Sequence, residues 1–379
     1  MTSVTKWIIG VGVIIAIALL AWSAKNEPKP VDIKEPIKIG AVLPMTGIAA
    51  NYGEHQGNAI RMAEEEINAA GGINGRPLQL IIEDDGTNPT KTASAMQKLA
   101  SIDQTPIVIG AVWDFLANAA IPIADAQKVV LISPAAAPDT LERESQYFFT
   151  TFPPISLDLG IFKQLLMSRP QKERVVIMVI NNSWGLAHLK TFKQAITEEG
   201  RHELVQEVIL PKFDDNDIQA ELTKIKPLKP TVLLTALNLK DPAVLVRKNK
   251  ELGVNALVVA HNNVVANVYN GELSPQQMEG VITYHLTPPT ADFVSKYKAK
   301  FNKDPISEAD TAYDAVYVAK RALEAATDSN ADTIIKALHG ITDFQGASGL
   351  IDYSKGNYPA NKQPILKTFK NGVLQDLKL

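Results

Sequence analysis

The sequence predicts an α/β protein built from two similar lobes, each a parallel sheet covered by helices on both faces. From residue 37 onward, short and continuously apolar runs alternate with amphipathic stretches of helical period, which is typical of buried parallel strands. The segment TTFPP at 150–154 divides this alternation into two sets of the same kind. The length of 379 residues agrees, since it is enough for about two or three domains.

An uncharged apolar stretch, Trp7–Ala24, precedes the predicted lobes. As a helix it would be about 27 Å long, just enough to cross the hydrocarbon core of a bilayer. It is interpreted as an uncleaved membrane anchor or as a signal peptide, for which Ala21 and Ser23 supply the small residues before a cleavage site. Residues 1–24 are therefore a signal peptide or membrane anchor, and the proline-containing segment 25–36 is a linker. Both interpretations place the rest of the chain outside the cytoplasm.

The first set of elements is recognised from its periodicity and its stop signals. Ile60, Ala63 and Ile67 recur on one helical face, and Gly71-Gly72 ends that helix. The expected strands are Ile37–Leu43, Leu78–Glu83, Ile107–Gly110 and Val129–Ser133, and the expected helices are Gly53–Ala70, Thr90–Ser101 and Ala117–Ala126.

The second set repeats the alternation, and a mixed tail follows it. The second proline pair, Pro288-Pro289, marks the end of the set. Strands are expected at Arg174–Ile180, Leu204–Leu210, Thr231–Ala236, Ala256–Ala260 and Gly280–Leu286, with helices at Gly185–Glu199, Ile218–Leu228 and Pro242–Leu252. The tail is expected to hold helices at Ala291–Phe301, Asp310–Ala326 and Asp332–His339 and then short strands.

Composition excludes several classes of function. The 38 basic and 41 acidic residues leave a net charge of −3, so there is no basic field for nucleic acid. The chain has no cysteine, which excludes disulfides, thiolate metal sites and cysteine nucleophiles. No serine-hydrolase, zinc-protease, P-loop or dinucleotide motif occurs, and the six histidines are scattered. The run Glu83-Asp84-Asp85 precedes a helix start and is interpreted as structural instead of metal-binding. We expect no cofactor and no metal.

Three long segments resemble a known family. Residues 37–101, VIGAVWDF at 108–115 and LISPAAAPDT at 131–140 are similar to the leucine/isoleucine/valine-type substrate-binding proteins of ABC importers. The resemblance implies the type I periplasmic-binding-protein fold, in which two doubly wound lobes close on a small solute about a three-strand hinge.

On this chain, the resemblance places the hinge crossovers near 150–154, 285–289 and 345–351. Lobe 1 would consist of 37–152 plus 287–346, and lobe 2 of 153–286 plus 347–379.

The residues themselves indicate where a ligand would bind. In open parallel sheets, ligands lie beyond the carboxyl ends of strands, where helix N-termini present free N–H groups. The loops that follow the predicted strands carry aromatic, amide and carboxylate side chains among turn residues. The candidate ligand-binding residues are Tyr52, Trp113, Asp114, Phe115, Ala135, Ala137, Trp184, Asn238 and Asn262.

Each of these residues also has a structural interpretation. Tyr52 can pack against its own helix, and Asp114 can cap the helix that follows it. The two tryptophans can belong to a core between the lobes, and the asparagines can be turn formers. The sequence alone leaves these alternatives open.

The resemblance also implies a role for each position, and this chain departs from several of them. The family's tyrosine falls on Tyr52, but its carboxylate-binding hydroxyl falls on Asp114. The segment of small residues falls on 133–137, where Ala135 is kept and the last hydroxyl is replaced by Ala137. The aromatic residue of lobe 2 falls on Trp184, and the acid that binds the ligand's ammonium group falls on Asn262. A ligand carboxylate beside Asp114 would be repelled, so an amine, an amide or a cation is expected.

The function indicated is capture of a small amino-acid-like, amide or amine ligand and its delivery to the permease of an ABC importer. Branched-chain and other amino acids stay among the candidate ligands. In the usual amino-acid pose, however, their carboxylate would lie beside Asp114 and be repelled. The alternative is a membrane-tethered ligand-sensing receptor domain of the same fold. An enzyme is not expected, because no catalytic motif was found.

Overall fold

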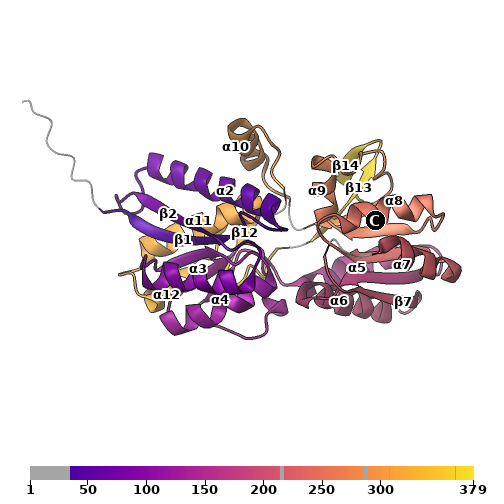
Figure 1. Cartoon of the computed structure of the whole chain (residues 1–379), viewed down its shortest axis with the longest axis horizontal. Coiled ribbons are helices and arrows are strands. Elements are labelled where there is room, and N and C mark those ends of the chain that lie inside the picture. The colour runs from indigo at the N-terminus through magenta and orange to yellow at the C-terminus, as the bar shows by residue number, and fades with distance from the viewer. Residues whose placement is uncertain (1–34, 214–216, 286–287, 307, 363) are drawn as a thin grey trace, which may run out of the picture. The chain divides into compact units, whose positions relative to one another are not determined.

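Two separate sheets organise the chain between residue 37 and the C-terminus (Figure 1). The structure is a computed structural model, and it describes residues 35–213, 217–285, 288–306, 308–362 and 364–379. The expected apolar helix at Trp7–Ala24 lies outside the described residues. Among the helices within these ranges, none is both long enough and apolar enough to cross a membrane.

The first sheet is parallel throughout. Its register pairs Ile37 with Leu78 and Gly40 with Val108, so the carboxyl ends of its strands lie at one edge. The order across the sheet is β2 (Leu78–Asp84), β1 (Ile37–Leu43), β3 (Ile107–Gly110), β4 (Val130–Ser133) and β5 (Phe148–Thr150).

Helices cover both faces of this sheet, as the apolar strands predicted. Helix α2 packs against α11, and α3 packs against α4, with the strands between these two pairs (Figure 1). A short antiparallel pair, β11 and β12, follows the last helix. The bounds are α2 (Ala50–Ala69), α3 (Pro89–Ser101), α4 (Asp114–Gln127), α10 (Ala291–Phe301), α11 (Ala309–Ala325), α12 (Ala331–His339), β11 (Phe344–Gly346) and β12 (Gly349–Ile351).

The second sheet is mixed. Five strands are parallel, and β13 and β14 extend the sheet in antiparallel fashion beyond β10. The order is β14 (Val373–Asp376), β13 (Ile365–Lys370), β10 (Ile282–His285), β9 (Leu257–His261), β8 (Val232–Ala236), β6 (Arg174–Ile180) and β7 (Glu203–Leu210). Its helices are α5 (Leu159–Met167), α6 (Ser183–Glu199), α7 (Ile218–Ile225), α8 (Asp241–Glu251) and α9 (Asn263–Tyr269).

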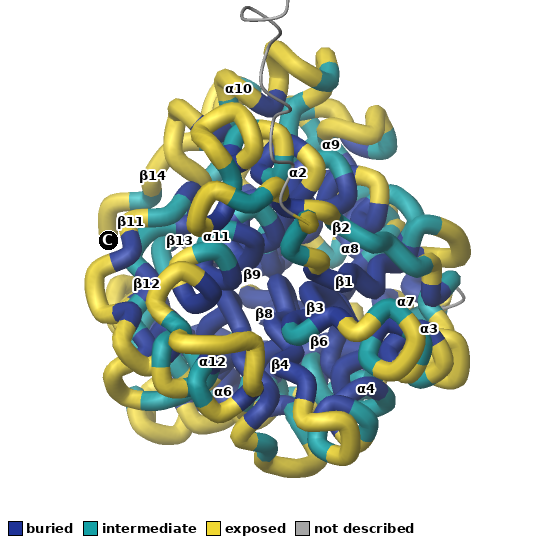
Figure 2. The backbone as a smooth tube through the Cα atoms, turned by 90° about the vertical axis from the view of Figure 1, so that its left-hand side faces the viewer, coloured by how far each residue is buried: buried dark blue, intermediate teal, exposed yellow. Residues whose placement is uncertain are grey.

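The central strands form the cores of the two lobes. In Figure 2 the tubes of β1, β3, β4, β6, β8 and β9 are buried, whereas much of the helical periphery is exposed. The side chains of Ile39, Ile109 and Ile177 have no exposed surface, and burying a side chain of this size stabilises the fold by about 1.5–3 kcal/mol. The apolar core of the first sheet also includes Ile351 and Tyr353.

Every expected strand and helix of the two sets is present among the described residues, whereas the strand β5 and the α-helices α5 and α9 were not expected. Strand β5 has only three residues, too few to show a period. Helix α5 was missed although its run LGIFKQLLM is amphipathic. Helix α9 follows β9 after the single residue Asn262, which was interpreted as a turn former. Helix α4 starts at Asp114 instead of Ala117, with Trp113 as its N-cap residue.

Candidate functional site

The carboxyl ends of the two sheets border a common cavity, which we call the interlobe cavity. It holds about 430 Å³ of empty space, part of it open to solvent. Seven of the nine predicted residues line it: Trp113, Asp114, Phe115, Ala135, Ala137, Trp184 and Asn238. The seven further lining residues are Thr140, Phe152, Asn182, Phe213, His261, Asn263 and Glu308.

Asp114 lies where helices from the two sheets meet. It is the first residue of α4, so it does not occupy the N-cap position that the structural interpretation gave it. Its side chain is 4% exposed, and burial raises the pKa of its carboxyl group. The Ser183 hydroxyl and the backbone N–H groups of Phe115 and Trp184 act in the opposite direction but do not outweigh burial. The carboxyl group is thus buried beside two helix N-termini.

Aromatic rings form the wall around Trp113. Its ring centroid lies 5.7 Å from that of Tyr52 in an edge-on arrangement, and 6.0 Å from that of Phe115. From the second lobe, Phe213 approaches Trp113 to 5.7 Å. Trp113 is only 7% exposed and touches rings from both lobes. It therefore packs in a core between the lobes and lines the cavity at the same time.

Trp184 approaches the cavity from the start of α6. The N-cap residue Asn182 fixes this turn, since its side-chain oxygen accepts a 2.8 Å hydrogen bond from the N–H of Gly185. The indole ring packs edge-on against His188 at 4.7 Å and His261 at 5.2 Å. Trp184 is therefore held by aromatic contacts on its own lobe while it lines the cavity.

Tyr52 does not line the cavity; it lies behind the wall and connects the lobes. Its hydroxyl donates a 2.9 Å hydrogen bond to Oδ1 of Asn238, which also accepts from the N–H of Leu239. Leu239 has a φ of +57°, a backbone conformation that turns the chain sharply after β8. The structure thus gives Tyr52 a positioning role toward Trp113 and Asn238.

The loop after β4 is held by the hydroxyl of Ser133. This oxygen accepts from the N–H of Ala136 at 3.0 Å and donates to the carbonyl of Ala111 at 3.1 Å. Ala135 and Ala137 then line the cavity with methyl groups. Their small size leaves the room that larger side chains would take.

Asn262 lies outside the interlobe cavity, and its neighbour Asn263 lines it instead. Asn262 lines a second, larger space of about 1010 Å³ that shares Phe152, His261 and Glu308 with the first. Asn263 is 3% exposed, and its Oδ1 has no hydrogen-bond partner among the described residues. Helix α9 begins at Asn263, and Asn262 precedes it as the N-cap residue.

Glu308 is one of the cavity residues that the sequence did not indicate. It precedes α11 with a φ of +73° and is 8% exposed. Its carboxylate accepts a 3.1 Å hydrogen bond from Nε2 of Gln56, while burial and the nearby Asp310 raise its pKa well above the usual range. A glutamate before a helical pattern carries no signal that distinguishes it from a surface residue.

A charged cluster borders the second space; we call it the Lys362 cluster, made of Lys362, Asp310, Asp314 and Ser348. Lys362 is 3% exposed, and its Nζ donates to the carbonyl of Thr151 at 3.0 Å and to the Ser348 hydroxyl at 2.5 Å. Burial raises the pKa of Asp310 to about 6, although Lys362 opposes this shift. The cluster joins segments near 151, 348 and 362 from distant parts of the sequence.

The carboxylates at 83–85 have separate partners. Glu83 pairs with Lys98 at 2.6 Å, and Asp84 accepts from the N–H and hydroxyl of Thr46. Asp85 accepts from the N–H of Thr87 and the hydroxyl of Thr92. The contacts of Asp84 tie the end of β2 to the loop after β1, and those of Glu83 and Asp85 tie it to α3 and to its own loop.

Comparisons with known proteins agree with this fold. A periplasmic binding protein family model matches residues 36–366. The Leu/Ile/Val-binding protein of Rhizobium johnstonii is 27% identical over 84% of this chain and 88% of its own. The leucine-, isoleucine-, valine-, threonine- and alanine-binding protein of Pseudomonas aeruginosa is 24% identical over 85% of this chain and 86% of its own.

Solved structures show the same arrangement of elements. A branched-chain amino acid transporter substrate-binding protein from Streptococcus pneumoniae, in complex with isoleucine, superimposes with a TM-score of 0.80 at 23% identity, covering 91% of this chain and 100% of that one. A solute-binding protein of an ABC transporter from Rhodopseudomonas palustris, in complex with 3,4-dihydroxybenzoic acid, superimposes with a TM-score of 0.79 at 23% identity. The match covers 91% of this chain and 97% of that one. The chain belongs to the periplasmic binding protein family.

Proposed function

We propose that this protein captures a small ligand with amine or amide N–H groups in the interlobe cavity and delivers it to the permease of an ABC importer. The lobes close about a hinge formed by the crossovers near 150–154, 285–289 and 345–351. The protein works outside the cytoplasm, with Trp7–Ala24 as its tether to the membrane. It has no catalytic activity in this proposal.

The observation that carries the proposal is that residues from both lobes line one cavity and touch across it. The hydroxyl of Tyr52 bonds to Asn238 at 2.9 Å, and the rings of Trp113 and Phe213 lie 5.7 Å apart. Such contacts stabilise a closed arrangement, and a ligand that touches both lobes adds to them. The names of the relatives describe binding and transport, which favours an importer component over the sensor alternative.

The ligand class is inferred from Asp114. The relatives' named ligands include leucine, isoleucine and 3,4-dihydroxybenzoic acid, all of which carry a carboxyl group. Asp114 places a protein carboxyl group at the helix N-termini beside the cavity, so a ligand with N–H donors at that end is favoured over a carboxylate.

A thermal-shift screen followed by small-angle scattering tests this function. A ligand at 100 times its Kd stabilises the protein by about 2.7 kcal/mol, which raises the melting temperature measurably. The ligand found should also reduce the radius of gyration, because the lobes close on it. An unchanged scattering profile at saturation contradicts closure.

N-terminal sequencing of the exported protein tests the tether. An uncleaved anchor leaves the original N-terminus in place, and the protein then fractionates with membranes. A mature start at Ala24 or Lys25 shows a cleaved signal peptide and a released protein.

A further inference from the structure

The groups that would bind a ligand carboxylate in the interlobe cavity already interact with a carboxyl group of the protein. Helix N-termini are favourable sites for anions because their N–H groups are unpaired and their dipoles are positive. Here the N-termini of α4 and α6 meet. The carboxyl group of Asp114 accepts hydrogen bonds from the N–H groups of Phe115 and Trp184 and from the Ser183 hydroxyl. A carboxylate on the ligand would find these donors engaged and would be repelled by Asp114.

Among the described residues that line the interlobe cavity, the buried side-chain atoms without a hydrogen-bond partner are acceptors. Oδ2 of Asp114 and Oδ1 of Asn263 are buried and have no hydrogen-bond partner among the described residues. Both residues line the interlobe cavity, and they are 4% and 3% exposed. Buried acceptors are almost always paired in native proteins, so the missing donors are best supplied by N–H groups of a ligand.

A second carboxyl group enters the same cavity from another element. Glu308 precedes α11, accepts one hydrogen bond from Gln56 and lies near the charge of Asp310. Asp114 instead interacts with Ser183 and with N–H groups of its own helix and of α6. Glu308 also lines the second space, which Asp114 does not, so the two carboxyl groups have different neighbours and different surroundings.

The walls between these polar groups suit a cation. Trp113, Phe213 and Trp184 present aromatic rings, whose negative faces attract ammonium groups. Among the described residues that line the interlobe cavity, none is lysine or arginine, so the described part of the cavity offers its two carboxyl groups no cation.

We propose that the ligand is a small diamine, with one amino group bound by Asp114 and Asn263 and the other by Glu308. Its apolar middle lies between the aromatic rings, and neither end is a carboxylate. This inference rests on the proposed function, because it names the ligand class of the same cavity.

Calorimetric titration of the full-length chain in mild detergent tests the two-ended recognition. The probes are 1,4-diaminobutane, the matched monoamine 1-aminobutane, 4-aminobutanoate, leucine and benzoate. We expect the diamine to bind at least about tenfold more tightly than the monoamine, since the second amino group gains a charged partner. 4-Aminobutanoate should bind more weakly than the monoamine, because its carboxylate faces Glu308. Diamines of three to six carbons, tested in series, should show one preferred length.

Glu308→Gln is the decisive variant. It keeps the size of the side chain and removes the charge, so the preference for the diamine over the monoamine should fall to less than about threefold. Binding of the monoamine should persist, which shows that the cavity is still folded. Glu54→Gln is the matched control, because Glu54 is exposed on α2 and pairs with Lys303 outside the cavity. This control should keep the full preference.

The outcomes separate the two proposals. If leucine or benzoate binds and the diamines do not, the diamine inference is wrong and the proposed function stands with another ligand class. An unchanged diamine preference in Glu308→Gln also overturns the inference. If no probe binds, the inference fails, and if the broad thermal-shift screen also finds no ligand, the proposed function fails with it.

Discussion

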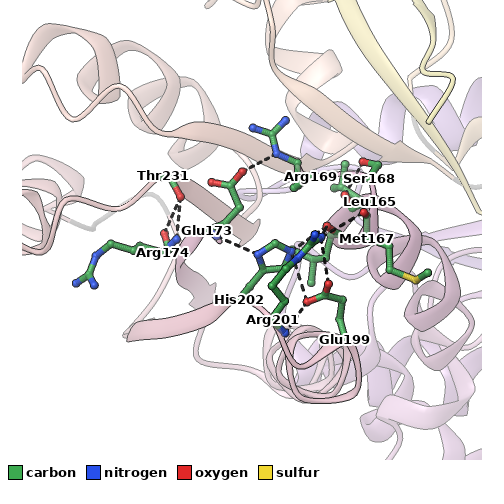
Figure 3. A network of polar contacts seen from close by, with 11 residues as sticks. Leu165, Met167, Ser168, Arg169, Glu173, Arg174, Glu199, Arg201, His202 and Thr231 are labelled. Atoms are coloured by element: carbon green, nitrogen blue, oxygen red, sulfur yellow. Dashed lines mark hydrogen bonds and ion pairs between the residues drawn. The ribbon is translucent and has the colours of Figure 1, made fainter. Parts of the chain in front are cut away.

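The two ends of strand β6 differ in how the buried polar groups around them are hydrogen-bonded. At its amino end, His202 lies between Glu173 and the end of α5, in a group of contacts that we call the His202 clasp (Figure 3). Nδ1 of His202 accepts from the N–H of Glu173 at 3.0 Å, and Nε2 lies 2.8 Å from the carbonyl of Leu166, to which it donates. Arg169 pairs with Glu173 at 2.8 Å, and Arg201 donates to the same carbonyl of Leu166 at 3.2 Å.

At its carboxyl end, β6 leads into the turn that carries Trp184 beside Asp114. There the buried acceptors of Asp114 and Asn263 lack partners among the described residues. The clasp satisfies its polar groups within the chain, whereas the cavity leaves acceptors for another molecule. The difference separates a part of the lobe that stabilises the fold from the part that we propose binds the ligand.

Asp114→Asn should have the largest effect, and it should act on binding. Removing one partner of a buried charge pair typically costs about 2–5 kcal/mol, or some 30- to 4,000-fold in affinity. The melting temperature without ligand should stay the same or rise, because the variant removes a buried carboxyl group that burial disfavours. Calorimetric titration with the ligand found by screening, together with thermal unfolding, measures both quantities. Wild-type affinity in this variant would remove Asp114 from the site.

His202→Ala should show the reverse pattern. It leaves the N–H of Glu173 and a buried carbonyl with fewer partners, so the free energy of unfolding should fall by about 2–4 kcal/mol. Ligand affinity should change little, since the clasp lies at the opposite end of β6. Denaturant unfolding measures the loss, and Lys172→Ala is the control, because its exposed pair with Glu203 at 3.5 Å contributes at most about 1 kcal/mol. A large loss of affinity with unchanged stability would refute the division of roles.

Asp310→Asn should change the pH dependence of stability. The pKa of Asp310 is raised from 3.8 to about 6, so between these values the folded protein binds a proton that the unfolded chain has released. The contribution of Asp310 to stability therefore falls as pH rises through this range, by up to about 3 kcal/mol. The variant should lose less stability than the wild type between pH 4 and pH 7.

Unfolding curves at several pH values give this difference directly. Lys362 and Asp314 face Asp310 and remain in the variant, and Glu308, Asp114 and Asp314 carry shifts of the same direction, so the dependence is reduced and not abolished. If the variant instead loses more stability than the wild type as pH rises, the electrostatic attraction between Asp310 and Lys362 outweighs burial.

Tyr52→Phe should have the smallest effect. It removes the hydrogen bond between the lobes, but Asn238 keeps its bond from the N–H of Leu239. A single neutral hydrogen bond contributes about 1 kcal/mol, so affinity should fall roughly fivefold through a less favourable closed state. Scattering should show a slightly larger radius at subsaturating ligand. A loss as large as that of Asp114→Asn would mean that Tyr52 touches the ligand itself.

Local pattern was sufficient for most of the fold. Three strands were predicted at their observed bounds: Ile37–Leu43, Ile107–Gly110 and Arg174–Ile180. Short, continuously apolar runs between turn residues are typical of buried strands, so the local sequence was sufficient. Short elements such as β5 could not be predicted, since three residues show no period. The anchor or signal peptide, the hinge and the boundaries of the lobes stay predictions.

For the site, the sequence by itself determined which loops meet, because parallel strands bring their carboxyl ends to one edge of the sheet. That was enough to select Trp113, Asp114 and Trp184. Only the tertiary structure decided which neighbouring side chain points inward, as with Asn263 in place of Asn262, and that Tyr52 lies behind the wall. It also brought Glu308 from a distant segment, because packing α11 against α2 is a contact between residues far apart in the chain, and no local pattern records such a contact.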